Sequence, residues 1–372
     1  MSAPKLQFHR AFLAMLLPAF VAACSSKPPP DYAPDPGLVS QITELRMITS
    51  MARVCPGRTI EAVYQAVLAD GRVVPFSRKY DKDNPPSLHV IFLRRWSTTA
   101  VSRESGDWDT EGDPLVTAMD GFQLHAELRA KPSLAVSTVV EPEYSCMPRA
   151  FRFDGPTGRR GEPGYPGPDV LVRVGTARSP FYHELLVVGI QVGDAPTFYL
   201  LQDARAVRPS DWLVIDSRGG RGGRGLTGEE GARGAPGRAG CPGTRGGVGG
   251  PGGAGGIGGP GGSGGHVTVM APTELPYLAG LIEGRSPGGA GGAAGPGGRG
   301  GRGGQGGDGV IVSGRRCASG PGGDRGPSGP AGGEGQDGAP GPRARVITVS
   351  ADDVFGQAVP LTLQALLDYA RR

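Results

Sequence analysis

Glycine occupies every third position from Gly219 to Gly264, sixteen times in succession. The same spacing returns from Gly289 to Gly307 and from Gly320 to Gly341. Residues 219–341 contain 52 of the 67 glycines, so the other 249 residues contain 15, an ordinary share. A region so poor in large side chains cannot fold around a conventional hydrophobic core. The chain therefore divides into an ordinary part and a repeat whose contacts must be made between backbones.

A three-residue period matches the polyproline II helix, which has three residues per turn, so the glycines align on one bare face. A bare face allows another backbone to approach closely. From Gly246 onward the triplets become Gly-Gly-X, and most triplets of residues 288–309 do the same, which leaves two bare faces instead of one. This pattern predicts extended glycine helices that pack side by side.

The period is similar to that of collagen, but the 12 prolines of residues 219–341 are only about 10% of that region, below the 15–20% typical of collagen-like chains. The Gly-Gly-X tracts resemble glycine-rich antifreeze proteins and phage fibre tips, in which glycine helices of one chain form a bundle. The resemblance implies a monomeric bundle in preference to a collagen-like trimer or a disordered region. Three strand-like interruptions, His266–Met270, Val310–Ser313 and Arg345–Val349, are expected to turn the chain back.

The N-terminus has the pattern of an export signal. Lys5 and Arg10 precede an apolar run over residues 11–23, which is too short to span a bilayer. The sequence Val21-Ala22-Ala23-Cys24 resembles the bacterial lipobox, which implies that Cys24 carries a lipid. The Ser25 that follows implies the outer membrane under that family's sorting pattern. We therefore expect a lipid-anchored protein of the bacterial cell envelope, with the membrane as one partner.

Four further cysteines fit an oxidising compartment, where an even number indicates disulfides. They are Cys55, Cys146, Cys241 and Cys317, and three pairings are possible. We favour Cys55–Cys146 with Cys241–Cys317, because each pair then stays within one compositional region.

The ordinary part predicts a β-sandwich-like domain followed by a second β portion, because short apolar runs alternate with turn signals. The strands expected in the first are 59–68, 72–76, 88–93, 122–128, 134–140 and 149–153, and in the second 170–174, 181–192, 197–202 and 212–216. Residues 41–54 fit either a helix or a strand. The stretch from Cys55 to Pro75 resembles the opening strands of bacterial Ig-like domains. At the other end, the apolar spacing of Pro360–Arg372 predicts a C-terminal helix that packs on the β domain.

These patterns predict seven regions. They are a signal peptide over 1–23, a Pro-rich tether over 24–37, the sandwich-like domain over 38–154, a short Gly-X-Y insert over 155–167, the second β portion over 168–217, the glycine module over 218–344, and a strand with the C-terminal helix over 345–372.

Several apparent site motifs arise inside the glycine tract. Residues 220–225 fit GxGxxG and residues 261–265 fit GxSxG, but neither is followed by the helix that each site requires. Asp308 and Asp337 lie in nonapeptides that resemble calcium-binding β-roll repeats. The copies are 29 residues apart rather than stacked in tandem, so we expect solvated aspartates instead of a metal site.

No catalytic constellation stands out from the sequence. His125 and His183 are the histidines around which an enzyme of residues 38–216 would be built, but no metal-binding or triad spacing surrounds them. The net charge of +4 is too small to indicate a nucleic-acid partner. We expect a mainly β, non-enzymatic protein without a cofactor, whose glycine module has a structural or adhesive role. A binding or assembly module for other envelope proteins is the alternative, and an envelope protein or a polysaccharide is the expected partner.

Overall fold

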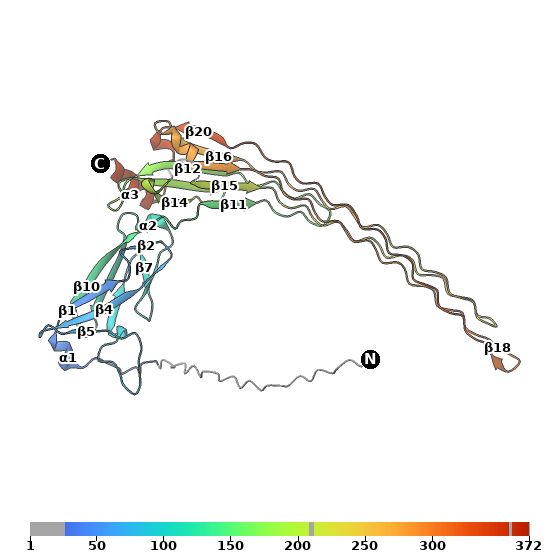
Figure 1. Cartoon of the computed structure of the whole chain (residues 1–372), viewed down its shortest axis with the longest axis horizontal. Helices are drawn as coiled ribbons and strands as arrows, with labels where there is room; N and C mark the ends of the chain where they lie inside the picture. Colours follow the sequence, from blue (N-terminus) through green and yellow to red (C-terminus); the bar gives the residue numbers. More distant parts are fainter. Residues whose placement is uncertain (1–26, 208–211, 357–358, 372) are drawn as a thin grey trace, which may run out of the picture.

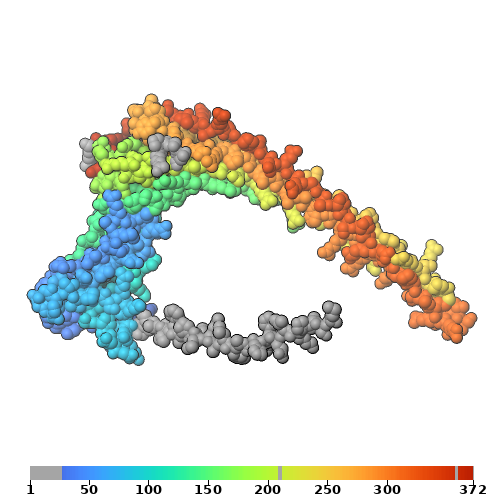
Figure 2. Space-filling model, in the orientation of Figure 1, coloured from blue at the N-terminus to red at the C-terminus, as the bar shows by residue number. Residues whose placement is uncertain are grey.

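The computed structural model describes residues 27–207, 212–356 and 359–371. It contains two β units and a long slender rod of glycine-rich chain that leaves the second unit (Figures 1 and 2). The expected fold class is confirmed, since the protein is mainly β and carries a glycine-rich bundle and a C-terminal helix.

The first unit packs small sheets around one core. Strands β1, β4 and β5 form one sheet, β2, β10, β9 and β6 a second, and β3, β8 and β7 a third. Alternating burial along β9 and β4 directs every second side chain into the core, where Trp108, Tyr64 and Phe122 are fully buried. The elements are α1 Pro36–Gln41, β1 Ile42–Thr49, β2 Arg53–Val54, β3 Thr59–Ile60, β4 Ala62–Leu68, β5 Val73–Pro75, η1 Val90–Phe92, β6 Leu93–Trp96, β7 Ala100–Ser102, β8 Trp108–Thr110, α2 Pro114–Thr117, β9 Phe122–Leu128 and β10 Lys131–Pro142.

The second unit is built from two facing sheets. One has the order β14-β13-β12-β16-β20, and the other the order β11-β15-β17. A core of Val, Leu and Ile side chains from both sheets lies between them. The elements are β11 Ala150–Asp154, β12 Val170–Ala177, β13 Leu185–Val192, β14 Phe198–Asp203, η2 Ala204–Ala206, β15 Leu213–Arg218, β16 Val267–Pro272, η3 Pro276–Leu281, β17 Ile282–Arg285, β20 Arg345–Val349, η4 Ala351–Asp353 and α3 Leu361–Ala370.

The two β units share a small apolar interface. Leu115 and Tyr144 of the first unit pack in one cluster with Tyr182 and Leu185 of the second. The Tyr182 hydroxyl donates to the carbonyl of Pro142 at 2.8 Å. Helix α3 buries Leu363 in the same cluster, as its apolar spacing predicts.

The rod consists of four extended segments that run alternately away from and back to the second unit. We call them rod segments 1 to 4, over residues 219–240, 243–265, 286–309 and 318–341. Segments 1 and 3 run outward from β15 and β17, whereas segments 2 and 4 return into β16 and β20. The short insert over 155–167 forms a hairpin between β11 and β12 and joins the base of the rod. Segments 1 and 3 thus continue the sheet of β11, β15 and β17, and segments 2 and 4 continue the sheet that contains β12, β16 and β20.

Backbone hydrogen bonds at every third residue join the segments. Segments 2 and 3 each bond to the three other segments, whereas segments 1 and 4 each bond to two. A three-residue layer across the rod contains five such bonds, all between 2.7 and 3.0 Å. In one layer they are Gly231 N to Arg299 O, Gly249 N to Asp324 O, Gly250 N to Ala232 O, Gly301 N to Gly250 O and Gly326 N to Gly301 O. The central position of segments 2 and 3 explains why these two carry most of the Gly-Gly-X triplets, since a segment with more neighbours needs more bare faces.

The glycines at the contacts between rod segments, here called contact glycines, are required because a side chain would not fit there. A Cβ atom added to Gly301 would overlap the carbonyl oxygen of Ala232, and one added to Gly329 would overlap that of Gly253. In the described rod segments, no glycine has a positive φ angle, so the left-handed conformation is not the reason for glycine there.

The rod is shorter than an unbroken glycine tract would make it. The sixteen triplets from Gly219 to Gly264 do not form one rod, because the chain reverses at Cys241 and Pro242 without losing the glycine period. Segment 1 alone, at about 3.1 Å per residue, extends roughly 65 Å. A reversal inside the tract was not expected, because only the strand-like interruptions had been assigned that role.

Several expected elements differ in detail. The strand expected over 59–68 is two strands, because β3 pairs with β8 while β4 pairs with β1. The strand expected over 88–93 begins as a 3-10 turn, because the His89 side chain accepts a hydrogen bond from the Ile91 amide and caps that turn. Within residues 41–54, Gln41 ends helix α1, and the strands β1 and β2 follow, separated by residues 50–52. Strands β7, β8 and β17 were not predicted, and each is only three or four residues long.

Strand pairing also groups the chain differently from the seven expected regions. Strand β11 pairs in parallel with β15 and thus belongs to the second unit, although it precedes the boundary expected at residue 154. Strand β20 pairs in parallel with β16 and joins the same unit.

Replacing Gly329 with alanine should destabilise the rod, because its Cβ would meet a backbone carbonyl that cannot move alone. We expect the free energy of unfolding to fall by about 2 kcal/mol or more. Gly333→Ala in the same segment is the matched control, since its Cβ would meet only the Ile257 side chain at 4.0 Å. Thermal unfolding followed by circular dichroism measures both, and equal effects of the two substitutions would contradict the packing.

Candidate functional site

The expected lipidation site, Cys24, and the expected signal peptide lie outside the described residues, which begin at Lys27. Among the described residues, no helix has the length and apolarity to span a bilayer.

The two aspartates of the calcium-like nonapeptides lie at opposite ends of the rod. The carbonyl of Asp308 accepts from the Gly240 amide beside the chain reversal, whereas the Asp337 carboxylate accepts from the Gly291 amide near the base, at 2.8 Å. The structure does not bring them together. Over residues 27–207, 212–356 and 359–371, no three His, Cys, Asp or Glu side chains gather as a metal site would require.

The two glycine motifs lie within the rod, where the extended chain continues past them. Residues 220–225 belong to segment 1 and residues 261–265 to segment 2. Their glycines contact neighbouring segments, which accounts for the spacing without a ligand.

The two histidines lie apart, with His125 half-buried on strand β9 and His183 exposed in the second unit. His125 stacks on Trp96 at 5.3 Å between ring centroids, and its Nδ1 lies 2.7 Å from the Ser137 hydroxyl. Trp96 and Ser137 are the direct cross-strand neighbours of His125, so these contacts are ordinary for a β-sheet. In the described part of the chain no carboxylate hydrogen-bonds to His125, and His183 lies beside Glu184 in a separate shallow cavity. A catalytic triad is not formed by these groups.

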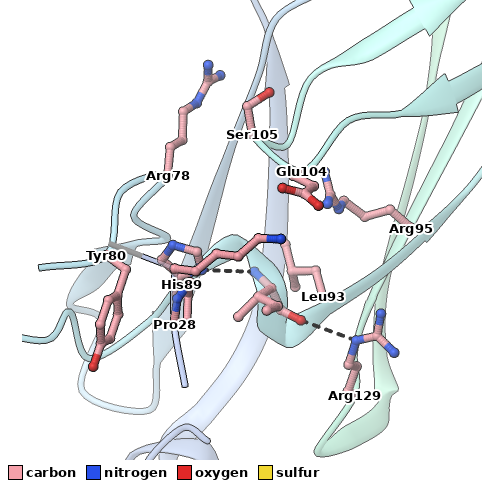
Figure 3. A pocket seen from close by; sticks show the side chains of 11 residues that line it. Pro28, Arg78, Tyr80, His89, Leu93, Arg95, Glu104, Ser105 and Arg129 are labelled. Carbon is pink, nitrogen blue, oxygen red and sulfur yellow. Dashed lines mark hydrogen bonds between the residues drawn. The ribbon is translucent and has the colours of Figure 1, made fainter. Parts of the chain in front are cut away.

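A basic cavity in the first unit was not expected from the sequence. It has a volume of about 650 Å³ and is lined by Lys27, Arg78, Arg95 and Arg129, with Glu104 as its one acidic residue (Figure 3). These residues come from the tether, from the loop after β5, from β6 and from the β9–β10 turn. They are scattered over about a hundred positions, so no local spacing could have indicated the cavity.

The basic side chains differ in how far they are neutralised. Arg78 forms an ion pair with Asp107 at 2.9 Å. Arg95 donates to the Arg103 carbonyl at 2.7 Å, and its Nε is buried without a hydrogen-bond partner among the described residues. Arg129 donates to the Ile91 carbonyl at 3.2 Å. Neither Arg95 nor Arg129 forms an ion pair with a described acidic residue, so the cavity carries excess positive charge.

His89 forms part of the wall of this cavity. Burial lowers the pKa of its imidazole below the ordinary value of 6.5, and the nearby positive charge of Arg95 lowers it further. Its Nδ1 accepts from the Ile91 amide at 3.2 Å, which requires the neutral ring.

The free end of the rod carries a second candidate site. Strands β18 (Ile311–Val312) and β19 (Arg315–Arg316) form a hairpin there (Figure 1). Val310, Ile311 and Val312 are 39%, 69% and 50% exposed, and the two arginines are exposed beside them. We call residues 310–316 the tip hairpin. It combines an apolar surface with positive charge.

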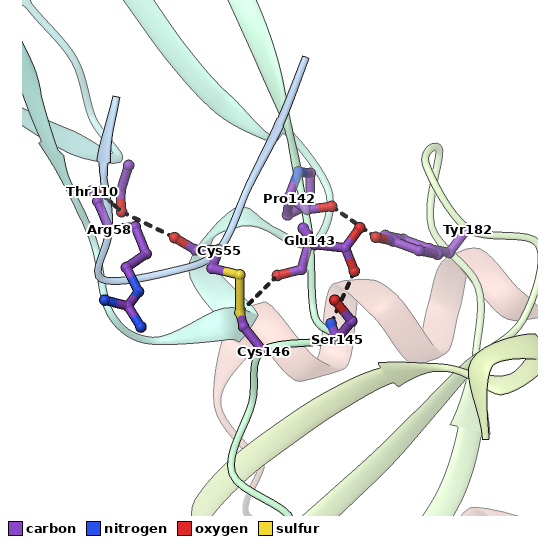
Figure 4. Close-up of a disulfide and its surroundings, with 8 residues drawn as sticks. All are labelled: Cys55, Arg58, Thr110, Pro142, Glu143, Ser145, Cys146 and Tyr182. Atoms are coloured by element: carbon purple, nitrogen blue, oxygen red, sulfur yellow. Dashed lines mark hydrogen bonds between the residues drawn. A yellow bond between two sulfur atoms is a disulfide. The ribbon is translucent and has the colours of Figure 1, made fainter. Parts of the chain in front are cut away.

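The disulfides join the favoured pairs. Cys241–Cys317 ties the first chain reversal of the rod to the base of the tip hairpin, with 5.1 Å between Cα atoms. Cys55–Cys146 ties the loop after β2 to the loop after β10, with 6.4 Å between Cα atoms (Figure 4). The latter lies beside the Pro142–Tyr182 hydrogen bond and thus close to the interface of the two β units.

Comparison of the chain with protein-family models, with curated proteins and with solved structures finds no match.

Removing the Cys241–Cys317 disulfide should loosen the free end of the rod. A disulfide typically contributes about 2–4 kcal/mol, so Cys241→Ser with Cys317→Ser should raise trypsin cleavage at Arg238 and Arg245 at least about tenfold. Cys55→Ser with Cys146→Ser is the control and should leave cleavage at these two arginines unchanged. Equal cleavage rates in the wild-type protein and the Cys241/Cys317 variant would contradict a closed tip.

The lowered pKa of His89 should make the first unit less stable in mild acid. The unfolded chain protonates this histidine near pH 6.5, while the folded protein resists protonation. The stability is therefore complete above pH 6.5 and declines as the pH falls toward the folded-state pKa, by at most about 1.4 kcal/mol per pH unit. His89→Asn preserves the cap without the titration. Urea unfolding between pH 5 and 7 should show a flatter profile for this variant, and an unchanged profile would contradict the assignment.

Proposed function

We propose that the protein is a non-enzymatic lipoprotein of the bacterial envelope that holds an adhesive tip on a rigid glycine rod. The observation that carries this proposal is the tip hairpin, where apolar and cationic side chains are exposed at the free end of a rod closed by a disulfide. Clustered exposed apolar residues are typical of interaction surfaces. The rod itself supplies shape and stiffness, since its contacts are made by backbone groups.

The rod suits mechanical display because its segments are cross-linked along their whole length. Five hydrogen bonds in each three-residue layer restrain the four segments, so bending one segment strains its neighbours. The base is held by the second unit, because β15, β16 and β17 contribute to its core and β20 pairs with β16, and all four strands continue into the rod. A contact made at the tip is therefore transmitted to the β units.

The proposed membrane attachment depends on the lipobox-like sequence that ends at Cys24 and on the Pro-rich tether after it. Two disulfides support an extracytoplasmic location, since such bonds persist in oxidising compartments. Outer-membrane attachment remains part of the proposal through Ser25.

An assembly module for other envelope proteins is the second candidate. It is favoured by the hydrogen-bonding edges of β18 and β19, since this sheet has only two strands and each edge can accept a further strand. The two roles differ in partner, and the tip hairpin is the contact in both.

Growth of the native bacterium with radioactive palmitate tests the anchor. The wild-type protein should be labelled and Cys24→Ser should not, because the Cys24 thiol is the acylated group. Protease added to intact cells should then cleave the rod if the protein is displayed at the surface. Absence of the label from the wild-type protein would contradict the lipoprotein proposal.

Polar substitutions in the tip hairpin should weaken adhesion without disturbing the rod. Beads coated with the Ile311→Ser, Val312→Ser variant should bind cells of the native bacterium at least about tenfold more weakly, because burying such side chains contributes about 1.5–3 kcal/mol each. Val248→Ser is the matched control, since Val248 is also exposed, at 62%, but lies in segment 2. Equal binding by the tip variant and the wild type would contradict the adhesive role of the tip.

A further inference from the structure

The basic cavity of the first unit opens beside an apolar groove. The groove has a volume of about 510 Å³ and runs between the tether prolines Pro28–Pro30 and the 3-10 turn with Ile91 and Phe92. The cavity and the groove share Pro28, Ile91 and Arg129 in their walls. We propose that this combined site binds an anionic phospholipid of the membrane, with its phosphate in the cavity and part of an acyl chain in the groove.

The charge of the cavity fits a phosphate group. Lys27, Arg95 and Arg129 contribute three positive charges that no described acidic residue pairs, against one carboxylate from Glu104. The Arg95 guanidinium lines the cavity and forms no ion pair with a described carboxylate, so its charge is available to a phosphate group. In Figure 3, the Arg95, Arg129 and Arg78 side chains surround the cavity from different strands and loops.

The groove fits an apolar chain. Its walls are the tether prolines, Tyr32, Ile91 and Phe92, and the rings of Tyr32 and Phe92 pack at 4.8 Å between centroids. Ile91 is 46% exposed although it follows buried Val90, so an apolar surface is left at the junction of groove and cavity. A free inorganic anion would use the cavity alone, whereas a lipid uses both.

The position of the site rests on the proposed anchor. Lys27 and Pro28 line the site, and Lys27 is three residues after Cys24, so a lipid on Cys24 lies within about 11 Å of chain from the cavity. The site then faces the headgroup layer of the same membrane. A second lipid contact would fix the first unit against the surface, and thus the direction of the rod.

Vesicle binding by the full mature chain with Cys24→Ser tests the site without acylation. The protein should bind phosphatidylcholine vesicles that contain phosphatidylglycerol and should not bind pure phosphatidylcholine vesicles. Arg95→Gln with Arg129→Gln should lower the partition coefficient about 25-fold, because each cation near an anionic surface contributes a factor of about five. Arg46→Gln with Arg152→Gln is the matched control, because both arginines are exposed, paired and remote from the site, and the net charge changes equally. Equal losses in the two double variants would overturn the site.

Two further measurements keep the assignment falsifiable. Arg95→Lys with Arg129→Lys should retain most of the binding, with an unchanged circular dichroism spectrum, so that a loss through misfolding is recognised. A soluble short-chain phosphatidylglycerol should bind at least tenfold more tightly than inorganic phosphate, and equal affinity would overturn the lipid assignment in favour of a free-anion site. These measurements do not depend on acylation, so palmitate labelling fails separately if the anchor proposal is wrong.

Discussion

The close approach of backbones at every third glycine is the contact on which this structure depends. Because the contact glycines lack a Cβ, carbonyl oxygens of neighbouring segments occupy the space where side chains would begin. That approach permits a hydrogen-bonded rod almost without a hydrophobic core. It also fixes the register of the strands at its base, since outward segments continue β15 and β17 and returning segments continue β16 and β20. The second β unit and the rod are therefore one continuous construction, in which parallel strands become parallel glycine helices.

The glycine period predicted this construction in part. The Gly-Gly-X triplets indicated helices with two bare faces, and the structure places them in the central segments 2 and 3. The reversal at Cys241 could not be predicted, because the period continues through it. Parallel pairing of β11 with β15 joins residues about 60 positions apart, and no local pattern reports such a pairing. The strands that were not predicted, such as β7 and β8, are too short to show an alternation of apolar and polar residues.

The two candidate sites differ in how visible they were in the sequence. Val310–Ser313 stood out as an apolar interruption of the glycine tract, and it forms one strand of the tip hairpin and the start of its turn. The basic cavity had no such signal, because Lys27, Arg95 and Arg129 become neighbours only through the folding of the first unit. A lipid contact near the anchor and an adhesive contact at the tip would place the two surfaces at the two ends of the molecule.

Hydrogen exchange at single amides tests the single-chain bundle most directly. In segment 2, both glycines of a Gly-Gly-X triplet donate to other segments, as Gly249 does to Asp324 and Gly250 to Ala232. Both amides of each pair from Gly249 to Gly256 should therefore exchange slowly, at rates that do not change when the protein is diluted. Slow exchange at only one glycine of each pair, or protection lost on dilution, would contradict the bundle and indicate an assembly between chains.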